Sequence, residues 1–205
     1  MSLLNPQQQQ QVAAAIQQAE RHTDAELVTV LAPQADDYTY IPLLWAGLLA
    51  LIVPGAINYF PGFLDMHSLV LCQWAVFIAL ALVFRTAPLR SRLVPRAVRF
   101  WRASNLARRQ FLEQNLHHTD GETGMLIFVS EAERYVEILV DRGIAQRIPD
   151  STWESVVADF TEQVKRGDIT AGFVGCIEAC GAQLREHIPA SREKNELPNH
   201  LVMLQ

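Results

Sequence analysis

Charged side chains are absent from two long stretches of this 205-residue sequence. Residues 38–64 contain none and residues 66–84 contain no Asp, Glu, Lys or Arg, so Asp65 alone separates two apolar runs. Each run is long enough to cross a hydrocarbon core of about 30 Å as a helix, which takes about 20 residues. A helical hairpin buried in a soluble core is disfavoured, because the remaining chain is too short to cover two helices that are apolar all round. The sequence therefore predicts a transmembrane hairpin over residues 41–84.

A cleavable signal peptide is not expected, because residues 1–21 are rich in glutamine and alanine and lack a basic start followed by an apolar run. The first apolar run is then a retained internal signal-anchor. Cysteine is also scarce, with Cys72 in the second run and Cys176 and Cys180 one helical turn apart. Without further Cys or His nearby, that pair predicts small side chains on a buried helix face and a reduced cytoplasmic compartment.

Acidic side chains are missing between residues 85 and 109, where eight arginines occur, although the net charge of the chain is −5. The loop between the apolar runs, 61–67, has no Lys or Arg. The positive-inside rule therefore predicts a multi-pass protein of a bacterial inner membrane with both termini cytoplasmic. An arginine run beside a span sets topology more often than it binds nucleic acid, so no nucleic-acid partner is predicted. The side chains expected to contact anionic lipid headgroups are Arg85, Arg90, Arg92, Arg96 and Arg99.

The rest of the sequence predicts an α/β domain. Asn5 and Pro6 are typical of a helix start, and the apolar, β-branched run 26–32 is typical of a buried strand. Further patterns predict a helix over 94–118, an antiparallel pair of strands at 124–130 and 134–141, a helix opened by a capping box at Ser151 and closed by Gly167, and a helix over 170–187. A helix joins the first two strands, which favours parallel pairing with a right-handed crossover.

The predicted fold is an α/β/α sandwich with a small mixed sheet, interrupted by the transmembrane helical hairpin. Five segments follow along the chain. They are the first helix and strand (1–40), the hairpin (41–84), a basic juxtamembrane helix (85–118), the remainder of the domain (119–189) and a polar tail (190–205).

Acidic side chains follow the first two predicted strands. Asp36 and Asp37 come after the first strand, and Glu131 and Glu133 come after the second, so parallel pairing would bring all four to one edge of the sheet. Clustered carboxylates bind hard cations such as calcium, and a bound cation polarises a phosphate oxygen. The alternative is an acidic loop surface, and the sequence has no EF-hand spacing, P-loop or serine elbow to favour catalysis. The histidines at 117–118 are interpreted as a helix C-terminal cap.

The order of these elements resembles a known family. The segment LNPQQQQQVAAAIQQAERHTDAELVTVLAP, with Glu20, Thr23 and Glu26 at its turn, resembles the opening of TPM domains, and the segment from TGMLIFVS to GCIEACGAQL resembles the remainder. The positions that fit the family pattern are Gly124, Arg134, Val136, Ile138, Gly143, Ile144, Gly167, Asp168, Gly172 and Phe173. The resemblance implies an α/β/α sandwich. Family members serve as photosystem-repair factors, receptor-accessory proteins, weak acid phosphatases and calcium binders, so the fold does not decide the function.

Many TPM domains are exported and carry a membrane helix at one end, whereas here a hairpin interrupts the domain. Two hypotheses follow. The first is a non-enzymatic accessory or scaffold module at the cytoplasmic membrane face, with an anionic bilayer and a membrane protein as partners. The alternative is a divalent-metal-dependent phosphatase at the membrane surface, whose cofactor would be a cation such as calcium.

Overall fold

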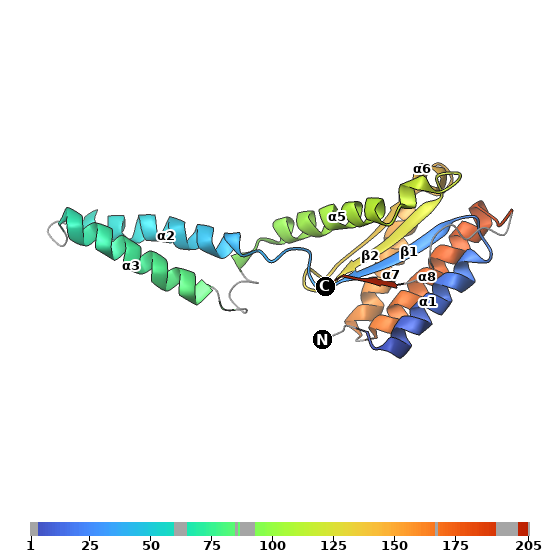
Figure 1. Ribbon diagram of the computed structural model, residues 1–205, viewed down its shortest axis with the longest axis horizontal. Coiled ribbons are helices and arrows are strands. Elements are labelled where there is room, and N and C mark those ends of the chain that lie inside the picture. Colours follow the sequence, from blue (N-terminus) through green and yellow to red (C-terminus); the bar gives the residue numbers. More distant parts are fainter. Residues whose placement is uncertain are drawn as a thin grey trace. The chain divides into compact units, whose positions relative to one another are not determined.

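The computed structural model describes residues 4–59, 65–84, 86, 93–166, 168–191 and 201–204. The chain divides into two compact units, which are described separately. The sheet unit comprises Met1–Ala35 and Phe100–Gln205, and the hairpin unit comprises Asp36–Arg99. Together they confirm the predicted α/β fold with a helical hairpin (Figure 1).

The sheet unit is built on four strands in the order β3-β2-β1-β4. β1 (Glu26–Ala32) pairs in parallel with β2 (Gly124–Ser130), and β2 pairs antiparallel with β3 (Tyr135–Val140), as the sequence predicts. The sequence did not predict β4 (Leu201–Met203), which pairs in parallel with β1 and falls within the segment expected to be a polar tail. A strand of three residues is too short to show periodicity, so only its partner reveals it.

The two faces of the sheet are covered differently (Figure 1). α1 (Pro6–Glu20), α7 (Asp150–Lys165) and α8 (Ile169–His187) lie on one face, and α5 (Arg96–Glu113) lies on the other. Successive strand residues point to opposite faces. Leu27 and Ile127 therefore pack with the three-helix layer, while the neighbouring Val28 and Phe128 pack with α5. The apolar runs of β1 and β2 are buried on both sides.

A side-chain cap fixes the start of α1 but not that of α7. The Asn5 side chain accepts a hydrogen bond from the Gln8 N–H, and the Gln8 side chain accepts one from the Asn5 N–H, both at 2.8 Å. This confirms the predicted start of α1. The capping box predicted at Ser151 is wrong, because the N-cap of α7 is Pro149, two residues earlier, and it provides no side-chain cap. Its predicted end at Gly167 lies outside the described residues.

α5 ends at Glu113, five residues before the predicted end of the helix. Asn115 has a positive φ of 57°, the left-handed conformation that ends a helix, and a short turn of 3-10 helix follows at η1 (Leu116–His118). In this turn the rings of His117 and His118 lie with their centroids 3.9 Å apart and their planes tilted by 46°. Their interpretation as a cap of a long α-helix is therefore corrected.

Two glycines of the family pattern lie where backbones approach closely. A Cβ atom at Gly124 would lie 2.1 Å from the carbonyl oxygen of Leu116. A Cβ at Gly143, in the short helix α6 (Arg142–Ala145), would lie 2.2 Å from the carbonyl oxygen of Gly121. Since neither backbone can move aside cheaply, only glycine fits at these two positions.

The hairpin unit contains α2 (Tyr40–Tyr59) and α3 (Met66–Phe84). Both are long and apolar enough to cross a membrane. Most of their large apolar side chains are exposed, as expected for helices that are surrounded by lipid. At the start of this unit, Tyr38, Ile41 and Val94 form a small buried cluster.

Candidate functional site

The carboxylates predicted as a metal site are distributed over both units. Asp36 and Asp37 open the hairpin unit, where Asp36 Oδ1 accepts a hydrogen bond from the Tyr38 N–H at 3.2 Å. Glu131 and Glu133 belong to the sheet unit, where Glu131 is exposed and Glu133 is buried. Among the residues that the structure describes, no group of three or more His, Cys, Asp or Glu side chains is placed to hold a metal ion. Metal binding here stays a prediction.

Glu133 has an evident structural role within the sheet unit. Its Oε2 atom accepts hydrogen bonds from the Ser130 hydroxyl and, at 3.1 Å, from the Ala35 N–H. Ser130 ends β2, and Ala35 lies three residues beyond the end of β1. This carboxylate therefore joins the ends of the two central strands at the point where the chain leaves the sheet unit for the hairpin.

Of the arginines predicted to contact lipid, the structure describes Arg96 and Arg99. Arg85, Arg90 and Arg92 lie outside the described residues. Arg96 and Arg99 lie on the first turn of α5, with Arg96 exposed and Arg99 half-buried. No acid occurs on α5 before Glu113, its last residue, so the helix is strongly basic over its whole length. Such a helix attracts anionic surfaces.

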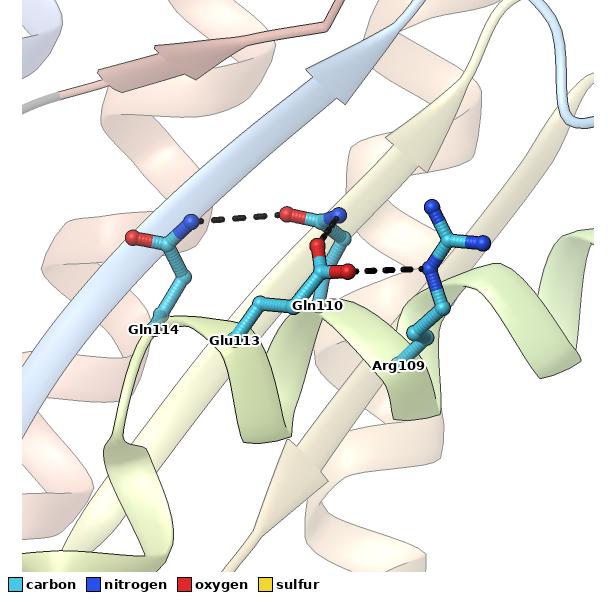
Figure 2. A network of polar contacts seen from close by, with 4 residues as sticks. All are labelled: Arg109, Gln110, Glu113 and Gln114. Carbon is cyan, nitrogen blue, oxygen red and sulfur yellow. Dashed lines mark hydrogen bonds and ion pairs between the residues drawn. The ribbon is translucent and has the colours of Figure 1, made fainter.

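A polar network lies at the C-terminal end of α5 (Figure 2). Arg109 Nε lies 3.0 Å from Glu113 Oε1, and the other oxygen of Glu113 accepts a hydrogen bond from the buried Gln110 amide. Gln114 in turn donates to Gln110 Oε1 at 3.4 Å. The network satisfies a polar side chain that α5 buries against the sheet, and it neutralises one of the arginines of the helix.

A second polar cluster joins α5 to the edge strand β3. Glu137 accepts hydrogen bonds from the Tyr135 hydroxyl at 2.9 Å and from the Ser104 hydroxyl at 3.3 Å. The rings of Phe100 and Tyr135 meet edge to face with centroids 5.2 Å apart. Sequence reasoning missed this cluster. The only available signal was that Tyr135 and Glu137 alternate along one strand, which does not reveal the helix they face.

Burial raises the pKa of the Tyr135 phenol, and the neighbouring carboxylate of Glu137 raises it as well, against the opposing effects of Ser104 and Arg108. The phenol is therefore protonated at neutral pH and donates its hydrogen bond to Glu137. The arrangement holds α5 in a fixed rotation on the sheet. The hydroxyls of Ser104 and Tyr135 both donate to Glu137, so the evident role of this cluster is to position the helix.

The turn between α1 and β1, which contains the Glu20, Thr23 and Glu26 of the family pattern, also has a structural role. Glu20 Oε1 accepts a hydrogen bond from the Leu27 N–H at 2.8 Å. The Thr23 hydroxyl donates to the Ile188 carbonyl at 2.6 Å and accepts from the Ala25 N–H at 3.2 Å. This turn connects the start of β1 to the end of α8.

A shallow hollow of about 180 Å³ lies between α1 and α8. Small residues form part of its lining where the two helices are close, since a Cβ at Gly181 would lie 2.8 Å from the Cβ of Ala19. Polar side chains, among them His22, Glu178 and Arg185, form part of its lining. The hollow has no cluster of nucleophile, base and cation.

Cys176 and Cys180 are free and lie on the buried face of α8. Their mutual hydrogen bond and their burial raise the pKa of the Cys180 thiol well above its ordinary value. A thiol in this state is a poor nucleophile and a poor metal ligand. The predicted packing role of this pair is confirmed.

The fold and these sites define a small α/β/α domain with a mixed four-stranded sheet, interrupted by a helical hairpin that is apolar enough to cross a membrane. Residues 98–183 match the model of the TPM domain. This match covers less than half of the chain, and it confirms the predicted resemblance to TPM domains.

One solved structure with a similar fold is the NMR structure of the BA42 protein from the psychrophilic bacterium Bizionia argentinensis. The TM-score is 0.61 at 18% sequence identity, and the match covers 98% of this chain and 96% of that one. At this identity the likeness supports the fold alone. No curated protein matches the sequence.

Proposed function

We propose that this protein is a membrane-anchored accessory or scaffold module that holds its TPM domain at the cytoplasmic face of a bacterial inner membrane. Both termini are cytoplasmic, and the hairpin crosses the bilayer twice. The arginines at 85–99 contact anionic headgroups, and the domain binds a membrane protein partner.

The position of the hairpin in the chain carries this proposal. α2 and α3 lie between β1, a central strand of the sheet, and α5, a helix of the same sheet unit from Phe100 onward. A terminal anchor would leave the domain on a single tether. Here the chain leaves the domain and returns to it, so both ends of the hairpin restrain one fold.

The charge distribution supports the orientation. Eight arginines and no acid lie between residues 85 and 109, directly after the second candidate span. Near an anionic leaflet each arginine contributes about 1 kcal/mol before screening. Short basic flanks of this kind stay on the cytoplasmic side.

Reporter fusions test the topology. We expect a reporter that is active only in the cytoplasm to work when fused after Gln205, and a periplasm-dependent reporter at the same position to be silent. The same pair of reporters inserted in the loop at 61–64 should give the opposite result. A periplasm-dependent reporter that is active after Gln205 would overturn the orientation.

Purification from membranes in mild detergent tests the scaffold role. We expect the full chain to retain a membrane protein partner. The Gly124→Ala variant, in which the new methyl group disrupts the sheet unit, should lose that partner. Retention by both variants would place the contact in the hairpin and contradict a scaffold role for the domain.

The TPM match favours one alternative, because this family is loosely linked to phosphatase-like activity. In this alternative Asp36, Asp37, Glu131 and Glu133 hold a divalent cation such as calcium, which polarises a phosphate ester. Calorimetry with calcium and magnesium and a screen of phosphate esters would detect it. Turnover that is lost in Asp36→Ala and Asp37→Ala but kept in the exposed control Asp159→Ala would establish the enzyme over the scaffold.

A further inference from the structure

Exposed apolar side chains are distributed very unevenly over the described part of the chain. Outside α2 and α3, Trp101 and Leu112 are the only large apolar side chains in that part that are exposed. Their exposed fractions are 59% and 55%, and both lie on α5. A soluble domain exposes single apolar side chains commonly, but two on one basic helix beside a membrane segment call for an explanation.

The two side chains lie on one stripe of the helix. At about 100° per residue, Trp101, Asn105, Arg108 and Leu112 fall within about 60° of one another, on the face opposite Ala103 and Ala107. Ala103 and Ala107 are buried against the sheet, whereas all four residues of the stripe are exposed. We call these four residues the outer stripe of α5.

The rotation of α5 is fixed by contacts on its other side. Ser104 bonds to Glu137 on β3, Phe100 packs on Tyr135, and Gln110 is buried in the network of Figure 2. The outer stripe therefore cannot turn inward to bury its tryptophan. Its exposure is a property of the folded sheet unit.

The composition of the stripe and its flank matches the interface of an anionic membrane. Interfacial helices combine Trp and Leu, which insert below the headgroups, with Arg, which binds them. Arg108 is exposed on the stripe, and Arg102 lies beside it with its guanidinium carbon 5.0 Å from the centre of the Trp101 ring. No carboxylate lies on the stripe to repel the leaflet.

Chain length keeps the stripe within reach of the bilayer. Only eleven residues separate the end of α3 at Phe84 from the start of α5 at Arg96, and a fully extended chain of that length spans at most about 40 Å. We propose that the outer stripe of α5 is a second membrane contact, in which Trp101 and Leu112 insert into the interface of the anionic leaflet and Arg108 binds its headgroups. This inference rests on the proposed function, because it needs the domain on the side of the membrane where the arginines lie.

The test uses the full chain in nanodiscs, with a polarity-sensitive fluorophore on a single introduced cysteine. Cys72→Ala removes the half-exposed native thiol, while the buried Cys176 and Cys180 stay. The probe is placed by Leu112→Cys, by the control Ala158→Cys on the exposed face of α7, or by Thr86→Cys directly after α3. The bilayer is phosphatidylcholine alone or with about one-third phosphatidylglycerol, and it carries nitroxide lipids as quenchers.

We expect a blue shift and loss of fluorescence at Leu112 and Thr86 in the anionic bilayer, and neither at Ala158. In Arg108→Gln the quenching at Leu112 should fall, while the quenching at Thr86 should not change. Quenching at Thr86 but not at Leu112 would overturn the second contact and leave the hairpin anchor intact. Absence of quenching at Thr86 would contradict the proposed function itself. A blue shift at Leu112 without quenching would mean that protein, such as a second copy of this chain, covers the stripe, and this too would overturn a lipid contact.

Discussion

The sheet unit and the hairpin unit place their apolar side chains in opposite ways. In the sheet unit they fill two cores, one on each face of the sheet, whereas in the hairpin unit most large apolar side chains point outward. The first arrangement removes apolar surface from water by folding, and in the proposed membrane the second would do so by insertion into lipid. The same kind of residue is therefore expected to respond to substitution differently in the two units.

Glycine substitutions should give the largest contrast. We expect Gly124→Ala to destabilise the sheet unit by about 4 kcal/mol or more, because the new Cβ would meet the Leu116 carbonyl oxygen. Gly47→Ala in α2 adds a methyl group where nothing lies within 4 Å, so it should be neutral or stabilise the helix by up to about 1 kcal/mol. Urea unfolding in detergent, followed by circular dichroism, measures both. Equal effects would contradict the contrast between the units.

Truncation of large apolar side chains is the next comparison. Phe128→Ala should cost about 3–5 kcal/mol, because the ring is fully buried between β2 and α5 and its loss leaves a cavity. Leu82→Ala should change the unfolding free energy in detergent by less than about 0.5 kcal/mol, because that side chain is 64% exposed. Thermal unfolding of both variants beside the parent protein provides the measurement.

A charge in the hairpin should affect insertion and leave the fold of the sheet unit intact. Ile78→Arg places a guanidinium on the exposed surface of α3, which should cost about 3 kcal/mol of apparent insertion free energy. The measurement is the membrane-integrated fraction after alkaline extraction, with Ile78→Leu as the control. Unchanged integration of the arginine variant would show that α3 does not contact the hydrocarbon core.

The smallest effect concerns the phenol between β3 and α5. Tyr135→Phe removes the hydrogen bond to Glu137 and should cost about 1 kcal/mol near neutral pH. Because the pKa of Tyr135 is raised above its ordinary value of 10.0, the folded state holds this proton more tightly than the unfolded state. The unfolding free energy should therefore fall as the pH rises above about 10, and this slope should be weaker in Tyr135→Phe. Equal slopes in the two proteins would rule out a contribution of this phenol.

Much of the fold could be predicted from local patterns. The apolar runs predicted the hairpin, and the paired strands at 124–130 and 134–141 were identified almost to the residue. The start of α1 was also correct, because Asn5 and Pro6 act on the first turn alone. The errors in helix boundaries occurred where the backbone conformation differed from the local sequence signal. α5 ends early because Asn115 turns left-handed, and α7 begins before the capping box, at Asp150 directly after the extended Pro149.

The candidate site could be predicted only in part. The sequence revealed the arginines between residues 85 and 109, since charge is visible in composition. It did not reveal which face of α5 packs on the sheet, because small residues such as Ala103 and Ala107 give a weak signal beside the large Trp101 and Leu112. Hydrophobicity alone would have placed the tryptophan inside.

The sequence by itself determined that two helices are apolar enough to cross a membrane, that the basic charge lies directly after them and that an α/β domain surrounds them, because hydropathy, charge and periodicity are sums over neighbouring residues. Tertiary structure decided the fourth strand at Leu201–Met203, the role of Glu133 in joining the ends of β1 and β2, and the outward rotation of Trp101. Each of these depends on contacts between residues that are far apart in the chain, and no local pattern contains them.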